Sequence, residues 1–327
     1  MKALSKETQI LRSHFLYLTR SYLFGKDFYE IDTPILKPVV GMEPYLDPFL
    51  VESPKGDERG YLITSPEYSL KQTLATGLDR IYEITHTFRS GEQGSPIHSR
   101  EFLMLELYVK GWDDKQLIDF IKDYFIYLFL EFSNSVKKNV GRENAKLKET
   151  IINSKSVEQM FNETTGMGFD KESLLIVIQK HSLTNTPFEE LKDWQYEDLF
   201  FLVFLNLVEP KLGEGIVFLY DYPPECAALS KIKDGRAKRF EIYWDGVELA
   251  NAFWELTDAK EQEARFKEEQ NLRKKLGKEV FPMDRDFLSV LESGNFPESA
   301  GISLGLDRIF MKLINQTSLA DSSPYYV

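Results

Sequence analysis

The sequence has a single cysteine, Cys226, among its 327 residues. One cysteine cannot build a disulfide framework or a thiolate metal site, and it fits a reducing cytoplasm. Long hydrophobic runs are missing as well, because "YFIYLFL" and "LFFLVFLNLV" are far shorter than the roughly 20 residues of a membrane-spanning helix. The N-terminal stretch "MKALSKETQILRSHF" also lacks the uninterrupted apolar core of a signal peptide. We therefore expect a cytoplasmic protein without a membrane segment.

Positive charge is scarce too. The net charge of −12 at pH 7 opposes sequence-independent binding to nucleic acid, which needs many clustered Lys and Arg side chains. The densest basic run is "SKIKDGRAKRF", which contains Lys231, Lys233, Arg236, Lys238 and Arg239. A solvated face is the commoner role of such a run, and a local basic patch is the alternative.

The chain shows strands, then helices, then strands again, without internal repeats or Gly/Ser linkers. This order favours an α+β fold with an antiparallel sheet over alternating βαβ units. Pro34 and Pro38 interrupt the strand-like stretch "FYEIDTPILKP". The predicted segments are a helix at 5–24, hairpins at 61–109, mostly helices at 113–205 with a polar, loose piece at 134–155, strands at 216–252, a charged helix at 258–275, and a strand and helix after 300.

The hairpin near residue 89 is the first candidate for chemistry. Its first strand, "IYEITHTFR", ends at Arg89, and the loop from Ser90 to Arg100 contains two glycines, a proline and His98. A loop of this length is suited to closing over a ligand. Arg89 and His98 could meet a phosphate while Phe102 stacks on a flat ring. The alternative is an ordinary surface hairpin.

The second strand of this hairpin, "REFLMLELY", has two different faces. With a period of two, the leucines at 103, 105 and 107 share one face and suit a buried core. Glu106 and Tyr108 fall on the opposite face beside Phe102. A carboxylate on such a strand raises the question of what stabilises its charge.

A second hairpin carries two more carboxylates. Asp245-Gly246 is a strong two-residue turn signal. Pairing outward from it sets Glu241 opposite Ala250, so that Glu241 and Glu248 are diagonal neighbours on one face. Two close carboxylates repel unless a cation or proton intervenes, and Mg²⁺ is the natural cation. A solvent-exposed strand face is the alternative.

The third piece is "ESAGISLGLDRIF" near the C-terminus. Gly301 and Gly305 punctuate a short strand, and glycines let a flat ligand lie close to the backbone. Arg308 follows in the first turn of a predicted helix, whose amide donors add positive potential.

These segments resemble the three signature motifs of class II aminoacyl-tRNA synthetases. "FYEIDTPILKP" is similar to motif 1, the Arg89 hairpin to motif 2, and "GISLGLDRIF" to motif 3. "TSPEYSLK", "REFLMLELY", "GVELANAFWELTDA" and "GLDR" resemble the lysyl-tRNA synthetase subgroup. The resemblance implies an antiparallel sheet flanked by helices in one catalytic domain, residues 1–327, with a mostly helical insertion at 113–205. Motif 1 implies a homodimer.

The lysyl-tRNA synthetase resemblance begins at motif 1, without room for the N-terminal OB domain that binds the anticodon in that subgroup. The family that fits is the truncated paralogue that activates beta-lysine and joins it to elongation factor P. The resemblance implies an ATP- and Mg²⁺-dependent ligase for lysine or beta-lysine, with tRNA an unlikely acceptor. The Lys231–Arg239 run would then meet the acidic acceptor. A ligase with another acceptor and a non-catalytic regulatory paralogue are the alternatives.

The resemblance also assigns site residues. Arg89 and Arg308 would act on the ATP phosphates with His98, Phe102 would stack on adenine, and Glu241 and Glu248 would hold Mg²⁺. Glu67 would meet the backbone amine of the substrate, Asn251 its carboxylate end, and Glu106, Tyr108 and Glu255 its side-chain ammonium. The remaining expected ATP contacts are Ser90, Gly91, Glu92, Ser99, Leu249 and Gly305. The remaining expected substrate contacts are Ser65, Pro66 and Ser303.

Four positions depart from the lysyl-tRNA synthetase pattern. Arg89-Ser90-Gly91-Glu92 replaces Arg-Asn-Glu, so the adenine-contacting glutamate is shifted to Glu92 or lost. Ser99 replaces an asparagine, and Ala252 replaces a glycine. Ser303 stands where the subgroup has glycine and the ligase family typically has alanine, which bears on the identity of the substrate.

Overall fold

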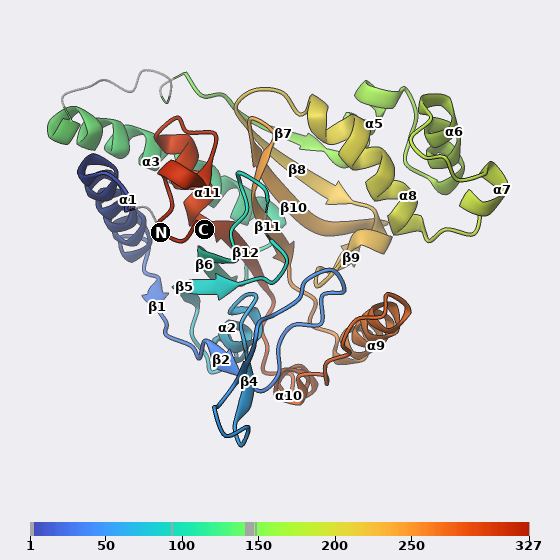
Figure 1. Ribbon diagram of the computed structural model, residues 1–327, viewed down its shortest axis with the longest axis horizontal. Helices are drawn as coiled ribbons and strands as arrows, with labels where there is room; N and C mark the ends of the chain where they lie inside the picture. The colour runs from blue at the N-terminus through green and yellow to red at the C-terminus, as the bar shows by residue number, and fades with distance from the viewer. Residues whose placement is uncertain (1–2, 93, 141–146, 148, 327) are drawn as a thin grey trace. The chain divides into compact units, whose positions relative to one another are not determined.

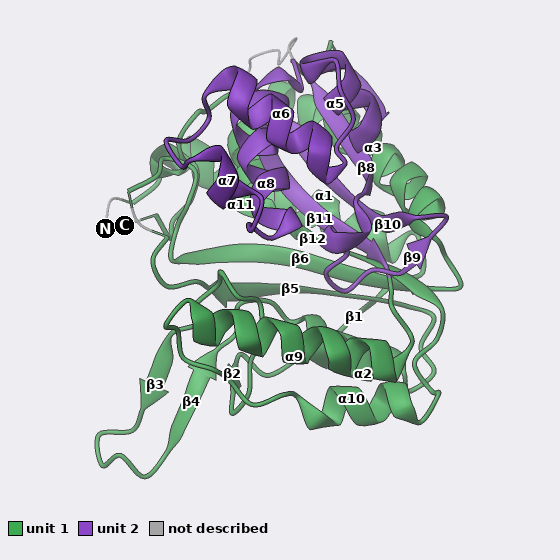
Figure 2. Ribbon diagram, turned by 90° about the vertical axis from the view of Figure 1, so that its right-hand side faces the viewer, with its two compact units in different colours: residues 1–149, 255–327 green, residues 150–254 purple. Residues whose placement is uncertain are grey.

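The computed structural model describes residues 3–92, 94–140, 147 and 149–326. The chain divides into two compact units (Figure 2). Unit 1 comprises residues 1–149 and 255–327, and unit 2 comprises residues 150–254. Residues 150–254 form a hydrophobic core of their own, and the single catalytic domain expected over residues 1–327 stays a prediction.

Unit 1 holds the segments that the sequence analysis assigned to motifs 1, 2 and 3 (Figure 1). Its helices are α1 (Lys6–Phe24), α2 (Glu67–Leu74), α3 (Asp114–Val140), α9 (Ala259–Lys275), α10 (Arg285–Glu292), α11 (Leu306–Leu313) and the short η4 (Leu319–Asp321). Its strands are β1 (Tyr29–Glu30), β2 (Leu36–Lys37), β3 (Leu50–Glu52), β4 (Arg59–Leu62), β5 (Arg80–Phe88), β6 (Glu101–Lys110) and β12 (Ser299–Gly305).

The main strands of unit 1 lie in the order β1, β5, β6, β12. The β5–β6 and β6–β12 pairs are antiparallel, and the short β1 runs parallel to β5. A separate small sheet has the order β2, β4, β3 and is antiparallel throughout. The antiparallel α+β fold predicted from the sequence is confirmed.

Helices pack against the main strands of unit 1. The helix α2 contacts β5 and β6, α10 packs on α2 and α9, and α1 packs on α3. The core between them contains Phe15 of α1, Phe132 of α3 and Phe310 of α11, all fully buried. The rings of Phe15 and Phe310 stack with centroids 5.6 Å apart. Burial of such large apolar surfaces, together with the backbone ladders, fixes β6 and β12 as a rigid platform.

Unit 2 surrounds its own strands with helices. Its strands are β7 (Ile152–Ser156), β8 (Ile216–Tyr222), β9 (Ile232–Lys233), β10 (Arg236–Trp244) and β11 (Val247–Trp254). Its helices are α5 (Val157–Thr165), α6 (Lys171–His181), α7 (Phe188–Leu191), α8 (Tyr196–Val203), and the short η1 (Phe204–Val208), η2 (Glu209–Lys211) and η3 (Pro224–Cys226). Stacked rings of Phe161 and Phe200, with centroids 5.2 Å apart, join α5 to α8 in the core.

Local sequence signals account for most element ends. The Ser5 side chain caps α1 by accepting from the backbone N–H of Thr8 at 3.1 Å, and Gly25 follows the last residue of the helix. Asp258 caps the charged helix α9 in the same way. The predicted helices at 5–24 and 258–275 are therefore confirmed, as are the strands at 216–252 and the strand and helix after residue 300.

Three expectations differ from the structure. The stretch 61–109, predicted as hairpins, includes the helix α2, because the strand-like apolar residues near 68–74 pack on one helical face instead. The helix α10 was not expected. The polar piece at 134–155 is helical to Val140 and forms β7 from Ile152; residues 141–146 and 148 lie outside the described part of the chain.

No helix in the described ranges is long and apolar enough to cross a membrane.

Candidate active site

The β5–β6 hairpin places Arg89 directly after β5. The backbone N–H of Arg89 donates to the carbonyl of Arg100 at 2.9 Å, which closes the base of the loop. The Arg89 guanidinium lies over the Phe102 ring, with its central carbon 5.1 Å from the ring centroid. Phe102 of β6 stands opposite Thr87 of β5, so their side chains point to the same side of the sheet. Glu106, four residues after Phe102 on β6, points to that side as well. The predicted hairpin and its face assignment are confirmed.

The loop after Arg89 brings His98 to the two arginines. His98 Nδ1 lies 2.8 Å from Ser95 Oγ, and Nε2 lies 3.6 Å from a Glu92 carboxylate oxygen. Burial, together with the positive charges of Arg308 and Arg89, lowers the pKa of His98, and Glu92 offsets part of this effect. A ring held neutral beside two guanidinium groups can donate or accept a hydrogen bond without adding to their repulsion. Arg89, His98 and Arg308 therefore form one cationic cluster.

Arg308 reaches the same loop from another element. It lies in the first turn of α11, and its Nε donates to the carbonyl of Ile97 at 3.0 Å. Gly305, which precedes α11 at the end of β12, has φ −77°, so its backbone conformation does not require glycine. The first turn of α11 adds N–H groups and the positive end of its dipole to the surroundings of Arg308.

The C-terminal segment fastens this loop. The Ser99 hydroxyl donates to the carbonyl of Tyr325 at 2.9 Å, and the Tyr326 hydroxyl donates to the carbonyl of Ser95 at 3.3 Å. The backbone N–H of Leu319 donates to the carbonyl of Pro96 at 2.8 Å. Ser99, expected to contact the nucleotide, thus uses its hydroxyl proton to hold the tail.

An acidic pocket begins on β6, on the same face as Phe102. Glu106 is fully buried and accepts hydrogen bonds from the Tyr108 hydroxyl at 2.6 Å and from the Ser303 hydroxyl at 2.9 Å. Ser303 stands directly opposite Glu106 in the β6–β12 ladder. The serine that departs from the family pattern therefore contacts the carboxylate expected to bind the side-chain ammonium of the substrate.

Gly301 has a different role from the one that the sequence suggested. It stands opposite Tyr108 in the ladder, and a Cβ at this position would lie 2.2 Å from Tyr108 Cε1 and 2.7 Å from Glu255 Oε1. Real Cβ contacts are never this short, so the bare backbone makes room for the phenol ring and a carboxylate of the protein itself. The expectation that Gly301 lets a flat ligand approach is corrected by this contact.

A lysine lies among the carboxylates. Lys71 is almost completely buried, and its Nζ is 2.6 Å from Glu67 Oε1 and 2.6 Å from Glu255 Oε2. Glu67 begins α2, directly after Pro66, and Lys71 follows one turn later on the same helical face. The Lys71 ammonium also lies 5.7 Å from the ring centroids of Tyr108 and Phe287.

Burial changes the proton affinity of this pocket. It raises the pKa of Glu106 to about 8, an effect that Glu67 reinforces and that Tyr108, Ser303 and Lys71 oppose. It also raises the pKa of Glu255 to about 7, with Lys71 acting in the opposite direction. Burial lowers the pKa of Lys71, but Glu255 and Glu67 outweigh it and raise that pKa above its usual value. The pocket is therefore suited to a cation that restores the charge of Glu106.

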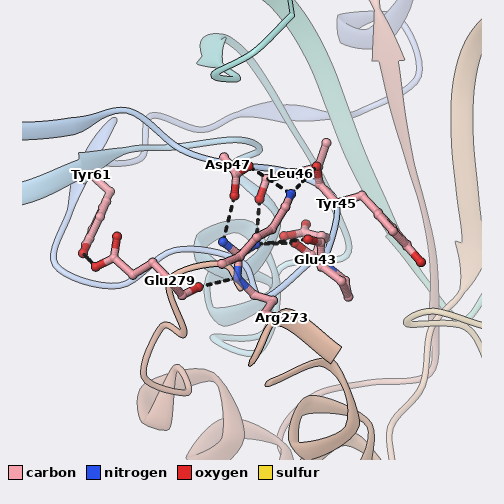
Figure 3. A network of polar contacts seen from close by, with 9 residues as sticks. Glu43, Tyr45, Leu46, Asp47, Tyr61, Arg273 and Glu279 are labelled. Atoms are coloured by element: carbon pink, nitrogen blue, oxygen red, sulfur yellow. Dashed lines mark hydrogen bonds and ion pairs between the residues drawn. The ribbon is translucent and has the colours of Figure 1, made fainter. Parts of the chain in front are cut away.

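A loop between β2 and β3 adds a further carboxylate (Figure 3). The buried guanidinium of Arg273 on α9 donates to the carbonyls of Glu43 and Leu46 and binds Asp47 Oδ1 at 2.8 Å. The backbone carbonyl of Asp47 in turn accepts from the N–H of Ser90, at the start of the motif 2 loop. Burial and Glu67 raise the pKa of Glu43, while Arg89 and Arg273 lower it.

Unit 2 carries the two carboxylates expected to hold Mg²⁺. Glu241 is buried and accepts from the hydroxyls of Tyr222 and Tyr243, each at 2.5 Å, and from the Arg239 guanidinium. Glu248 stands opposite Tyr243 on the same face and is exposed. A carboxylate offers about four lone-pair positions, so Glu241 keeps one for a metal, and hard oxygen ligands suit Mg²⁺. Among the described residues, no group of three or more His, Cys, Asp or Glu side chains could hold a metal ion.

A family model described as tRNA synthetases class II (D, K and N) matches residues 2–325. The chain belongs to this family.

Curated relatives cover nearly the whole sequence. An elongation factor P–(R)-beta-lysine ligase of Edwardsiella ictaluri is 34% identical over 318 residues, which are 95% of this chain and 92% of that relative. The protein of the same name from Erwinia tasmaniensis is 35% identical over 316 residues, 92% of this chain and 89% of its own length. A lysine–tRNA ligase of Carboxydothermus hydrogenoformans is 32% identical over 327 residues. This chain covers 64% of that longer relative.

In this class II synthetase chain, the structure brings most of the expected residues of unit 1 together. Arg89, His98 and Arg308 form one cluster, and Glu67, Glu106, Tyr108, Glu255 and Ser303 form the acidic pocket. Ser90, Gly91 and Glu92 lie at the start of the motif 2 loop, and Ser65 lines a small cavity with Gly41 and Tyr68. The ligands that these residues bind stay predictions.

The pairing predicted for the second hairpin is wrong beyond its first two pairs. Trp244 pairs with Val247 and Tyr243 with Glu248 as predicted, but a register shift then sets Glu241 opposite Asn251. A β-bulge of this kind inserts one residue into a strand and leaves buried Leu249 without a direct partner in the ladder. Asn251 accepts a hydrogen bond from Arg239 Nε at 2.9 Å through its side-chain oxygen.

The basic run of residues 231–239 is not a uniformly solvated face. Lys238 is buried against Asp221 at 2.8 Å, Arg239 binds Glu241, and Arg236 binds Glu158 at 2.8 Å. Lys231 and Lys233 lie over the Trp254 ring, at 5.4 and 4.8 Å from its centroid. Glu158 and Asp221, which are distant in sequence, and the nearby Glu241 neutralise part of the run and leave less free positive charge than the composition suggested.

Two residues near the site were missed from the sequence. Lys71 lies inside the quoted motif "TSPEYSLK", four residues after Glu67, and this spacing would have indicated an ion pair had the segment been recognised as a helix. Glu43 had no such signal, because its place is set by the Arg273 contacts from a helix more than 200 residues away.

Proposed function

We propose that this chain is an ATP-dependent, AMP-forming ligase that activates lysine or (R)-beta-lysine and transfers it to the ε-amino group of a lysine on elongation factor P. The observation that carries the proposal is the shared face of β6, where Phe102 stands beside the arginine cluster and Glu106 stands in the acidic pocket. One strand would thus align a site for an anionic, flat ligand with a site for an aminated one. The names of the curated relatives from Edwardsiella ictaluri and Erwinia tasmaniensis support elongation factor P as acceptor.

The first step needs charge neutralisation more than proton transfer. A substrate carboxylate oxygen attacks the α-phosphorus of ATP, a phosphorus–oxygen bond forms, and the bond to pyrophosphate breaks with its electron pair leaving on oxygen. Arg89 and Arg308 would bind the phosphates and stabilise the developing charge, and Phe102 would stack on the adenine. The acidic pocket would hold the amino groups so that the carboxylate points at phosphorus.

The second step joins the amino acid to the acceptor. The unprotonated amine of the acceptor lysine attacks the carbonyl carbon of the adenylate, the new nitrogen–carbon bond forms, and AMP leaves with its electron pair. The amine nitrogen loses one proton to solvent in the process. No side chain of the described residues is assigned to this proton transfer.

We assign Glu241 and Glu248 to the divalent ion that accompanies ATP. Mg²⁺ would neutralise phosphate charge and orient the leaving pyrophosphate. Hydrogen bonds from Arg239, Tyr222 and Tyr243 would hold the Glu241 carboxylate in one orientation.

A homodimer is part of the proposal. Apolar side chains on α1 and β1 are exposed to solvent in the single chain, with Tyr17 at 67%, Phe24 at 80% and Tyr29 at 63% of their full exposure. Ile126 and Leu130 on α3 add to these exposed groups. Clusters of large apolar groups left in water typically mark an interface between chains.

The test is amino-acid-dependent exchange of pyrophosphate into ATP, run with alpha-lysine, both enantiomers of beta-lysine, and ornithine. We expect exchange with lysine or (R)-beta-lysine and its loss in Glu106→Gln. No exchange with any of the four compounds would contradict the enzyme and favour a non-catalytic paralogue. Transfer of labelled amino acid to elongation factor P, with tRNA as the comparison acceptor, then decides between the two kinds of ligase.

A further inference from the structure

The fully buried ammonium of Lys71 has no place in the proposed chemistry, although it touches two carboxylates assigned to the substrate. Its Nζ donates a charge-assisted hydrogen bond to Glu67 Oε1 at 2.6 Å and forms an ion pair with Glu255 Oε2 at the same distance. Such a contact occupies an oxygen of each carboxylate before any substrate arrives. The two contacts therefore fix the orientation of the Glu67 and Glu255 carboxylates. They also reduce the negative charge that is left to attract a ligand.

We propose that Lys71 is a positioning and specificity-determining residue of the amino-acid pocket, which holds Glu67 and Glu255 in place and sets the net charge to match a substrate with two amino groups. This inference rests on the proposed function and deepens it by naming the device that selects diamino acids over monoamino acids.

The charge count supports this role. When ionised, the three carboxylates of Glu67, Glu106 and Glu255 and the one ammonium of Lys71 leave two negative charges. Lysine and beta-lysine each bring two ammonium groups in addition to the carboxylate that reacts. Without Lys71 the pocket would hold three buried carboxylates, and such a group takes up protons until its charge is tolerable.

The groups around Lys71 come from several elements. Glu67 lies on its own helix α2, Glu106 and Tyr108 face it from β6, and Glu255 lies at the end of the chain segment that precedes α9. From α10 it meets the uncharged ring of Phe287. Glu43 adds its charge near Glu67, where Arg89 offsets it. Among the described residues, Lys71 is the cation that forms ion pairs with both Glu67 and Glu255.

The informative variant is Lys71→Gln, because its amide keeps two N–H donors for the carboxylates and removes only the charge. Lys71→Met removes the donors as well. Without the cation, Glu255 should hold its proton to a higher pH, because Lys71 is the group that lowers its pKa. We expect kcat/KM for lysine to fall roughly tenfold or more at pH 7 and to recover toward pH 9, with KM for ATP unchanged. The loss in Lys71→Met should be larger.

The matched control is Lys37→Gln. Lys37 is also a largely buried lysine that contacts α2, through Ser69 Oγ at 3.0 Å, and pairs with Asp284 at 3.6 Å. Among the described residues, Lys37 forms no ion pair with Glu67, Glu106 or Glu255. Its variant should keep the wild-type pH profile even if it unfolds at a lower temperature.

A second comparison uses norleucine, which has the size of lysine without the side-chain amine. Wild-type protein should discriminate strongly between the two, and Lys71→Gln should discriminate less at pH 7. If Lys71→Gln shows the wild-type acid limb, or loses activity by the same factor at every pH, Lys71 is only a packing residue and the inference is wrong. Absence of lysine-dependent exchange in the wild-type protein would instead contradict the proposed function itself.

If neither Lys71 variant folds, lysine binding to the wild-type protein still tests the idea. Calorimetric titration with lysine and with norleucine across pH 6–9 should show tight binding of lysine alone. Equal affinity for the two compounds would overturn the charge match.

Discussion

Gly301 of β12 stands directly opposite Tyr108 of β6, and the phenol ring lies across the space that a side chain would take. The backbone of one motif thus shapes the pocket that another motif lines. This contact links the strand before Arg308 to the acidic pocket that contains Tyr108 and Glu255.

The first prediction concerns this contact. Gly301→Ala should displace the Tyr108 ring, because the added Cβ would lie 2.2 Å from Tyr108 Cε1. We expect a loss of stability of about 1–3 kcal/mol from overpacking and a rise in KM for lysine of at least roughly tenfold. Thermal unfolding and pyrophosphate exchange measure the two effects. Gly305→Ala, at the end of the same strand and with an ordinary φ, is the control that should affect lysine binding less.

Lysine binding should release a proton near neutral pH. Burial raises the pKa of Glu106 to about 8, so at pH 7 most free protein carries a proton on this carboxyl group. A bound ammonium favours the ionised form and expels the proton, up to roughly one per site. Calorimetry of lysine binding in buffers of different ionisation enthalpy measures the number. Glu106→Gln removes the titrating group, and an unchanged proton release in that variant would contradict the assignment.

The ligand-free protein should lose stability as the pH rises. The pKa values of Glu106 and Glu255 are raised in the folded state, from 4.5 to about 8 and about 7. The folded chain therefore holds protons that the unfolded chain has already lost. The stabilisation is complete below pH 4.5 and disappears as the pH rises through 7 and 8.

Glu106→Gln should flatten this dependence. Each proton contributes a slope of at most about 1.4 kcal/mol per pH unit to the free energy of unfolding. Urea unfolding of wild type and variant between pH 5 and 8.5 measures the difference. Equal slopes would show that Glu106 is not the titrating group.

The arginine cluster should act on the nucleotide step. Arg89→Ala and Arg308→Ala each remove a preformed positive group, and we expect roughly 10²–10³-fold lower exchange rates with little change in lysine affinity. Arg100→Ala, on the same loop, is the matched control and should have a much smaller effect. Stopped-flow or steady-state exchange at saturating lysine provides the measurement. A loss confined to KM for lysine would contradict the assignment of these residues to ATP.

The C-terminal segment should position the ATP loop. Removal of residues 324–327 abolishes the contacts of Tyr325 with Ser99 and of Tyr326 with Ser95. We expect KM for ATP to rise several-fold and KM for lysine to stay the same. Ser99→Ala distinguishes a structural role of this serine from a contact with the nucleotide. A loss of about 1 kcal/mol in the free energy of unfolding, the contribution of one hydrogen bond to the tail, supports the structural role. A much larger rise in KM for ATP would indicate that Ser99 contacts the nucleotide.

The sequence alone indicated the α+β fold, the motif 2 hairpin, the opposite faces of β6 and the ends of α1 and α9. These features depend on local signals: period-two alternation, capping residues, turn dipeptides and motifs of fixed spacing. The same signals brought Arg89, Phe102, Glu106 and Arg308 forward as candidates. The sequence did not predict the helix α2, because a short apolar segment can form either a helix or a strand.

Tertiary structure alone decided the rest. Whether the basic run at 231–239 is free depended on acids at Glu158 and Asp221, and the pairing of Glu241 depended on a bulge in β11. The place of Glu43 depended on Arg273, and the charge of the pocket depended on where Lys71 points. Sequence determines which charges exist and how neighbours along a helix or strand are spaced. Only folding determines which charges that are distant in sequence meet in a place from which water is removed. In such a place, a distance of a few ångströms decides whether a carboxylate is protonated, paired with a cation of the protein or available to a ligand.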